Sequence, residues 1–303
     1  MKAKLGIAPI AWSNDDLPEL GGETTLETRL SESKISGFSG VETGGKFPKS
    51  SSELGPILKD HKLYLASGWY SGTVLDNDLE KEKDQALEQL TLFRDLDAAC
   101  LAYGETSGTI QNVRNAPLNT KRKIHHEDYK IYGKKLTAFA EHCEDFGMPI
   151  SFHHHMGTAI ETEEELDNLM NNTGEAVKLL FDTGHMAFAG GNSLNVIKKY
   201  AHRINHFHAK DIRADIVNSL DRSKESFLDA VLKGAFTVPG DGSINFKEVV
   251  ETLAKNNYEG WFIVEAEQDP AKANPLEYAK IGNKELVECL KMYGYDIEGY
   301  KDE

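Results

Sequence analysis

The stretch FGMPISFHHHMGTAIETEEELDNLMNNTGEAVKLLFDTGH, residues 146–185, contains one complete strand–helix–strand repeat. Two short apolar runs, Pro149–His153 and Val177–Asp182, are bounded by turn residues and predict strands. Between them, Thr162 and Glu165 match the spacing of a capping box, which predicts the start of a helix. A strand, a helix and a second strand in this order are typical of a parallel sheet.

The same alternation extends from this repeat to both ends of the chain. Further apolar runs predict strands at Leu5–Ala11, Phe38–Glu42, Leu63–Ser67, Ala98–Tyr103, Ile204–His208 and Trp261–Glu265. Helical patterns separate the strands, for example Asp78–Leu96, Asp128–Phe146, Thr162–Met170 and Phe246–Asn256, and Leu276–Tyr293 predicts a closing helix. Eight such repeats predict an α/β fold, a (β/α)8 TIM barrel. A doubly wound open sheet alternates in the same way, but no glycine-rich dinucleotide fingerprint follows the first strand, which favours the barrel.

The chain has 303 residues and no linker or low-complexity run, so we expect a single barrel domain spanning residues 1–303. One connection, Arg213–Lys233, is longer than a normal loop between a strand and a helix. It predicts an extra helix, and we interpret residues from about 213 to 240 as an inserted, lid-like segment over the site.

Charge and cysteine content restrict the partners and the compartment. The chain has 34 Lys and Arg residues against 49 Asp and Glu residues, a net charge of -15. Such a surface repels nucleic acid and anionic lipid and leaves a small-molecule substrate as the expected partner. The three cysteines are widely spaced, and no apolar run is long enough for a signal-peptide core or a membrane span. We therefore expect a cytoplasmic protein with no membrane partner.

Polar residues that can bind a metal end four consecutive predicted strands. Seven of the 11 histidines lie between residues 153 and 208. The residues at or just after the ends of strands five to eight are His153, His154 and His155, then Asp182 and His185, then His206 and His208, then Glu265 and Glu267. Because the carboxyl ends of barrel strands form one face, we expect these side chains to converge there.

Alternation along each strand separates inward from outward side chains. If His153 points inward, His155 does too, while His154 points away toward the helices. The metal ligands that we predict are His153, Asp182, His208 and Glu265. The choices of His153 over His155 and of Glu265 over Glu267 stay open. Two imidazoles and two carboxylates suit Mn²⁺, Co²⁺, Fe²⁺ or Zn²⁺ better than Ca²⁺, and the absence of thiolates argues against a structural zinc.

Other polar residues are expected at the mouth of the barrel. Lys210 follows the seventh strand, where it can present an ammonium group to a substrate oxygen. The residues that we predict to contact substrate are Trp12 and Asn14 after the first strand, Glu42 after the second, Tyr103 and Glu105 after the fourth, and Arg213 at the start of the lid-like segment.

With this ligand set, the chain resembles the xylose isomerase-like barrel superfamily, which contains metal-dependent sugar isomerases, epimerases and lyases. In that group, Glu-x-His, Asp-Thr-x-His, His-x-Lys-Asp and a Glu on strands five to eight surround the metal. The matching stretches here are His153-His154-His155, Asp182-Thr183-Gly184-His185, His208-Ala209-Lys210-Asp211 and Val264-Glu265. The chain departs from the pattern at His153, which stands where the superfamily has a glutamate.

Within that superfamily, the whole chain resembles the inosose dehydratase family. The resemblance spans residues 6–270 and is carried by segments such as Phe152-His153-His154-His155-Met156-Gly157-Thr158 and Val264-Glu265-Ala266-Glu267-Gln268-Asp269-Pro270. It implies dehydration of 2-keto-myo-inositol (scyllo-inosose) to 3,5/4-trihydroxycyclohexa-1,2-dione in myo-inositol catabolism. It also implies Mn²⁺ or Co²⁺ and a requirement for glutathione. Related barrels often dimerise, so a homodimer is an assembly to consider.

The implied reaction removes a proton next to a carbonyl and expels hydroxide from the next carbon. The base candidates are His155, His185 and Glu267, with His155 or Glu267 preferred, and Lys210 is the candidate electrophilic helper. A metal-dependent sugar isomerase or epimerase is the nearest alternative, because it abstracts the same proton and then returns it. A metal-dependent nuclease and a catalytically silent sugar-binding barrel are further alternatives, and the negative charge disfavours the nuclease.

Overall fold

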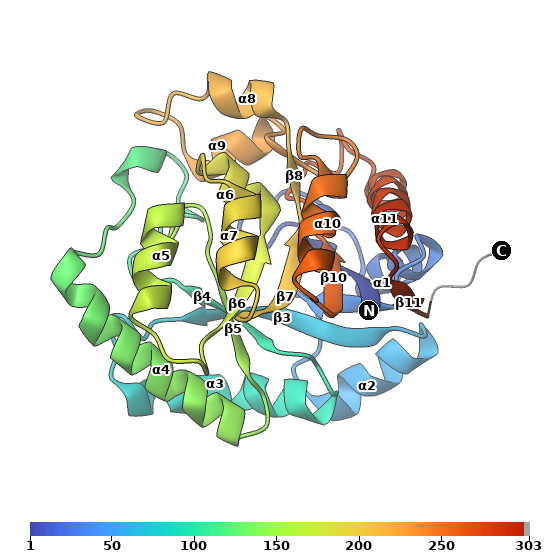
Figure 1. Cartoon of the computed structure of the whole chain (residues 1–303). Coiled ribbons are helices and arrows are strands. Elements are labelled where there is room, and N and C mark those ends of the chain that lie inside the picture. The colour runs from blue at the N-terminus through green and yellow to red at the C-terminus, as the bar shows by residue number, and fades with distance from the viewer. Residues whose placement is uncertain (300–303) are drawn as a thin grey trace.

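Eight parallel strands close into a barrel in the computed structural model, which describes residues 1–299 (Figure 1). These strands are β1 (Lys2–Ile7), β2 (Gly40–Thr43), β3 (Tyr64–Gly72), β4 (Leu101–Glu105), β5 (Ile150–His153), β6 (Lys178–Asp182), β7 (Ile204–Ala209) and β10 (Gly260–Val264). Because β10 pairs with both β7 and β1, the sheet has no free edge between its first and last barrel strands. The predicted (β/α)8 TIM barrel is confirmed. The end of the predicted single domain, residues 300–303, lies outside the described residues.

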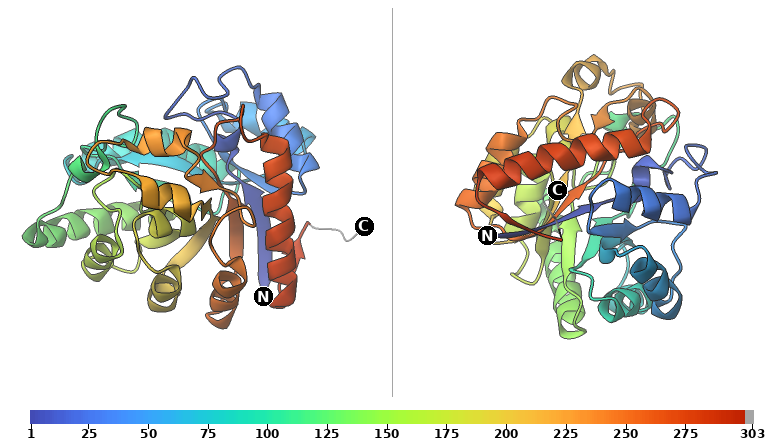
Figure 2. Two further views of the ribbon diagram at one scale, coloured as in Figure 1. Left: turned by 90° about the horizontal axis from the view of Figure 1, so that it is seen from above. Right: turned by 90° about the vertical axis from the view of Figure 1, so that its right-hand side faces the viewer.

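Helices surround this barrel. They are α1 (Leu26–Ile35), α2 (Ser51–Asp60), α3 (Leu79–Asp95), α4 (Tyr129–Asp145), α5 (Glu163–Asn171), α6 (Thr183–Phe188), α7 (Ser193–Tyr200), α10 (Phe246–Lys255) and α11 (Pro275–Met292). Short 3-10 helices lie at Pro9–Ala11, Leu118–Thr120 and His126–Asp128. The long helix α11 runs beside β1 (Figure 2), and after it β11 (Asp296–Glu298), which the sequence does not predict, pairs with β1 outside the barrel. No helix within residues 1–299 has the length and apolarity needed to cross a membrane.

Six of the eight barrel strands end at a different residue from the one predicted, and the first and third differ most. The sequence predicts a first strand through Ala11, but β1 ends at Ile7, because Pro9 has no backbone N–H to donate and begins a 3-10 helix. The third strand, predicted to end at Ser67, continues to Gly72, where it pairs with Glu105 of β4. This longer β3 carries Trp69 to the rim of the barrel.

The long connection after β7 forms a small layer at one end of the barrel, at the top of Figure 1. It contains β8 (Asp211–Ile212), α8 (Ala214–Ser219), α9 (Phe227–Leu232) and β9 (Phe236–Thr237), so two short helices replace the single helix that the sequence predicts. The strands β8 and β9 pair antiparallel. Apolar side chains of this layer pack with others from the rim loops in a hydrophobic cluster of their own, separate from the main core.

Asp211 holds the base of this layer. Its Oδ1 accepts hydrogen bonds from the backbone N–H groups of Ile212 (2.8 Å), Ser243 (2.9 Å) and Ile244 (2.9 Å). We expect Asp211→Ala to lower the free energy of unfolding by about 3 kcal/mol, because three backbone N–H groups lose their acceptor. Asp211→Asn keeps that oxygen and should cost less than about 1 kcal/mol, as measured by urea unfolding. Equal losses in the two variants would contradict this role.

Candidate active site

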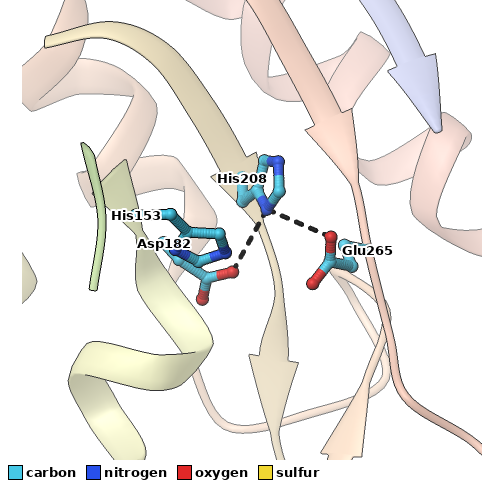
Figure 3. Close-up of side chains that lie close together, drawn as sticks. All are labelled: His153, Asp182, His208 and Glu265. Atoms are coloured by element: carbon cyan, nitrogen blue, oxygen red, sulfur yellow. Dashed lines mark ion pairs between the residues drawn. The ribbon is translucent and has the colours of Figure 1, made fainter. Parts of the chain in front are cut away.

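Four potential ligands from four neighbouring strands meet at the carboxyl end of the barrel (Figure 3). His153 and Asp182 are the last residues of β5 and β6, His208 lies near the end of β7, and Glu265 directly follows β10. Their ligand atoms all lie within 4.8 Å of one another. His208 Nδ1 is 3.5 Å from Asp182 Oδ2 and 3.2 Å from Glu265 Oε2. The structure therefore brings together the four residues that the sequence predicts as ligands.

The donor atoms of this group fit a divalent cation. The side chains are almost fully buried, yet His153 Nδ1, Asp182 Oδ2 and His208 Nδ1 have no hydrogen-bond partner. A buried polar atom without a partner is unfavourable, and a shared cation would satisfy all three atoms. Burial, reinforced by repulsion from His208, lowers the pKa of His153 well below its usual value. Its ring is therefore neutral, which is the form of imidazole that binds metals.

Glu42, near the end of β2, contacts the opposite edge of the His208 ring. Its carboxylate lies 3.2 Å from His208 Nε2 and 2.8 Å from His206 Nε2. Burial alone would raise the pKa of Glu42, but the two histidines outweigh it and lower the pKa to about 2. An ionised carboxylate at Nε2 keeps a proton on that nitrogen and turns Nδ1 toward Asp182 and Glu265. Glu42, predicted as a substrate contact, thus also orients a candidate ligand.

A second cluster lies beside the candidate ligands and contains His155, His185, Glu267 and Lys210. The Nε2 atoms of His155 and His185 are each 3.7 Å from Glu267 Oε1. Lys210 is fully buried, and its Nζ lies 2.7 Å from His185 Nε2, 2.9 Å from Glu267 Oε2 and 2.5 Å from Glu265 Oε1. Lys210 therefore connects the two clusters through the carboxylates of Glu265 and Glu267.

Both clusters border a cavity of about 130 Å³. The residues that line it include Ser13, Asp15, Asp16, Arg29, Glu42, Trp69, Gln111, His153, His155, His208, Glu265 and Glu267. His185 and Lys210 do not line it, so they lie behind its wall. Trp69 forms part of the wall, with its ring centroid 5.6 Å from that of His153 and 5.3 Å from that of His155. His154 points away, as predicted, and its Nε2 accepts from the backbone N–H of Asp182.

Of the six residues predicted to contact substrate, Glu42 lines this cavity and the other five do not. Tyr103 donates to Glu105, and the Tyr103 ring packs against Phe139 on the helix side of the barrel wall. Asn14 Oδ1 accepts from two backbone N–H groups of its own loop. Trp12 donates to Glu32 on α1, and Arg213 pairs with Asp241 in the layer after β7.

The cavity also contains residues that the sequence does not single out, chiefly Asp15, Asp16, Arg29, Trp69 and Gln111. None of them ends a predicted strand. They come from loops, from α1 and from the part of β3 beyond its predicted end. Asp15 and Asp16 lie within residues 6–270, over which the chain resembles the inosose dehydratase family, and that resemblance was the available sequence signal for the two aspartates.

A family model and curated proteins match the sequence over most of its length. Residues 30–289 match the model of a family described as xylose isomerase-like TIM barrel. A rhizopine catabolism protein, MocC, from Rhizobium meliloti is 47% identical, and the match covers 98% of this chain and 91% of that protein. An inosose dehydratase from Clostridium beijerinckii is 43% identical, with 95% of this chain and 97% of that protein covered.

Solved structures share the fold at low sequence identity. The IOLI protein, whose crystal structure is described with a zinc atom, matches with a TM-score of 0.67 at 16% identity, covering 96% of this chain and 99% of that one. A probable 3-DHS dehydratase, AsbF, from Bacillus anthracis matches with a TM-score of 0.65 at 14% identity, covering 94% of this chain and 98% of that one. At these identities the matches concern the barrel alone.

Proposed function

The chain belongs to the xylose isomerase-like TIM barrel family, and from this premise we propose that it is a hydro-lyase that dehydrates 2-keto-myo-inositol to 3,5/4-trihydroxycyclohexa-1,2-dione. The similarity to inosose dehydratases over almost the whole of both proteins is the observation that carries this proposal. The small cavity between a candidate metal site and a histidine–carboxylate cluster agrees with it.

His153, Asp182, His208 and Glu265 would hold the divalent cation, for which we propose Mn²⁺ or Co²⁺. When bound, such a cation supplies positive charge that stabilises an enolate forming from the substrate ketone. Glu42 orients His208 through its Nε2, and Lys210 holds the carboxylates of Glu265 and Glu267 from behind the cavity wall.

We propose His155 as the base that removes the proton next to the ketone. Its Nδ1 lies 2.8 Å from the backbone carbonyl oxygen of Met156. A carbonyl only accepts hydrogen bonds, so Nδ1 carries the proton of the neutral ring and Nε2 has the free lone pair. Glu267 Oε1, 3.7 Å from that nitrogen, stabilises the imidazolium that forms. The electron pair of the broken C–H bond first forms the enolate, which then expels hydroxide from the adjacent carbon and leaves a carbon–carbon double bond. The proton and hydroxide together make the released water, and the resulting enol tautomerises to the 1,2-dione.

Lys210 was the candidate electrophilic helper for the departing hydroxide. Its ammonium group lies next to Glu267 and does not line the cavity, so we propose that it influences the substrate only through the carboxylates that it contacts. We also propose that the layer containing α8 and α9 is the predicted lid, since Phe227 of α9 packs against the rings of His155 and His185.

The remaining features of the proposal rest on composition and on the resemblance. The three free, buried cysteines agree with a cytoplasmic location. The homodimer and the requirement for glutathione stay predictions, and none of the cysteines lines the cavity.

Removing the metal tests the proposed function directly. Treatment with EDTA should abolish the conversion of scyllo-inosose, and Mn²⁺ or Co²⁺ should restore it, because enolate formation depends on the cation charge. The readout is the ultraviolet absorbance of the conjugated dione. Consumption of scyllo-inosose without this absorbance would favour an epimerase, and full activity of the metal-free protein would refute the scheme.

A further inference from the structure

Arg29 of α1 is a buried cation, and two of its three side-chain nitrogen atoms lack a hydrogen-bond partner. Its side chain is 1% exposed and lines the same cavity as His153 and Glu265. Its Nε and Nη2 atoms have no hydrogen-bond partner. Arg203, which is 4% exposed, shows how the same protein satisfies a buried guanidinium, by donating to the backbone oxygens of Val177 and Gly174.

An unpaired buried guanidinium makes the folded state less stable. The chain itself supplies no hydrogen-bond acceptor to the Nε and Nη2 donors of Arg29. Because the side chain lines the cavity, a molecule bound there can supply an acceptor to the guanidinium group. The position of Arg29 thus points to ligand binding and not to a structural role.

The charges around the cavity restrict the class of ligand. Five carboxylate residues line it, namely Asp15, Asp16, Glu42, Glu265 and Glu267, and Arg29 is the one arginine or lysine among its lining residues. This surplus of negative charge disfavours a carboxylate or phosphate ligand. A hydroxyl group both accepts and donates, so it can receive a hydrogen bond from Arg29 and give one to a carboxylate.

Asp15 supplies such a carboxylate next to Arg29, and Asp16 lines the same cavity. Gly44 lies close to both Asp15 and Arg29. A Cβ atom on Gly44 would be 3.2 Å from Asp15 Oδ2 and 4.0 Å from Arg29 Nη1, and its absence leaves the space beside these two groups open. Asp15 and Asp16 are themselves held in place, Asp15 by the backbone N–H of Gly45 and Asp16 by the side-chain amide of Gln111. The wall thus presents a fixed guanidinium and fixed carboxylates together.

We propose that Arg29, Asp15 and Asp16 form a hydroxyl-binding subsite that recognises ring hydroxyl groups of an uncharged polyol and sets the specificity of the cavity. This inference rests on the proposed function, because it assigns the subsite to the same substrate. A site built to hydrogen-bond a hydroxyl discriminates strongly against an analogue that lacks it, since the buried guanidinium of Arg29 is then left unpaired.

The test compares scyllo-inosose with the set of its single-deoxy analogues, using the metal-loaded protein. For the wild type, one or more analogues should lose about 100-fold in kcat/KM. Arg29→Met should lower kcat/KM for scyllo-inosose by a similar factor and leave those analogues within about threefold of their wild-type values. Equal losses for every compound would overturn the subsite.

Thermal stability separates ligand binding from a structural role. Because Nε and Nη2 of Arg29 lack hydrogen-bond partners, Arg29→Met should leave the melting temperature unchanged or raise it by about 3 °C. The matched control, Arg203→Met, should lower the melting temperature and leave the discrimination between analogues unchanged. A melting temperature that falls in Arg29→Met, with proportional losses of activity on all compounds, would show that Arg29 is structural.

Binding of scyllo-inosose distinguishes a failure of the subsite from a failure of the proposed function. The compound should raise the melting temperature of the metal-loaded wild type, and Arg29→Met should lose this shift. If the shift depends on Arg29 but no dehydration occurs, the proposed function is wrong and the subsite stands. If dehydration occurs but the shift does not depend on Arg29, the subsite is wrong and the proposed function stands. If neither a shift nor dehydration is observed, both are wrong.

Discussion

Replacing Asp182 with Asn is expected to remove the bound metal and to reduce dehydration by about 1000-fold. In the variant an amide NH2 replaces Oδ2, the atom that faces His208 Nδ1 and Lys210 Nζ in the wild type. An amide NH2 cannot bind a cation. The fold should persist, because Oδ1 of Asp182 caps α6 by accepting from the backbone N–H of His185 (2.8 Å), and asparagine is an equally good N-cap. Elemental analysis, turnover and the melting temperature measure the three effects.

The matched control is Asp211→Asn, which makes the same chemical change on a buried aspartate next to Lys210. Asp211 contacts the backbone of the layer after β7 and is not one of the four candidate ligands. This variant should therefore bind metal at full stoichiometry. Full metal occupancy in Asp182→Asn would show that the ligand assignment is wrong.

Replacing His155 with Asn should stop catalysis and leave the metal in place. Asparagine can still donate to the carbonyl of Met156 from the position of Nδ1, but it has no counterpart of the Nε2 lone pair. We expect turnover to fall by about 1000-fold, since general base catalysis commonly contributes a factor of this order. Exchange of the substrate α-hydrogen with D₂O, followed by NMR, should fall by the same factor, because both processes need the base.

Two further variants identify the base more closely. His154→Gln alters the neighbouring histidine, which is buried and faces away from the cavity, and should leave exchange within a few-fold of the wild type. Glu267→Gln removes the carboxylate 3.7 Å from His155 Nε2 and should reduce turnover less than His155→Asn does. If Glu267→Gln abolished exchange and His155→Asn retained it, Glu267 would be the base.

The fold was predictable because it depends on a repeated local pattern. Each barrel strand is short, apolar and followed by a helix, so its presence can be recognised without knowing its partners. The errors lie where pairing or backbone chemistry decides the boundary. Pro9 ended β1 early, and pairing with β4 extended β3 past Ser67. Strand β11 was missed because its short run, Asp296–Glu298, has no apolar pattern.

The candidate ligands were predictable because strand ends converge in a barrel, and the side chains at those ends alternate in direction. The same alternation accounts for Tyr103, which faces the helices while Ala102 beside it lines the cavity. Arg29 could not be found in this way. A long side chain that reaches the cavity from a helix has no fixed spacing from any strand end, and its lack of partners is visible only in three dimensions.

The hydrophobic cluster of the rim loops is separate from the core of the barrel. Phe227, Phe236 and their neighbours pack with Phe188 and Met156, apart from the core that stabilises the barrel. Substitutions or length changes in the proposed lid would therefore alter the packing of Phe227 against the rings of His155 and His185, while the strands that position His153 and Glu265 keep the packing of the main core.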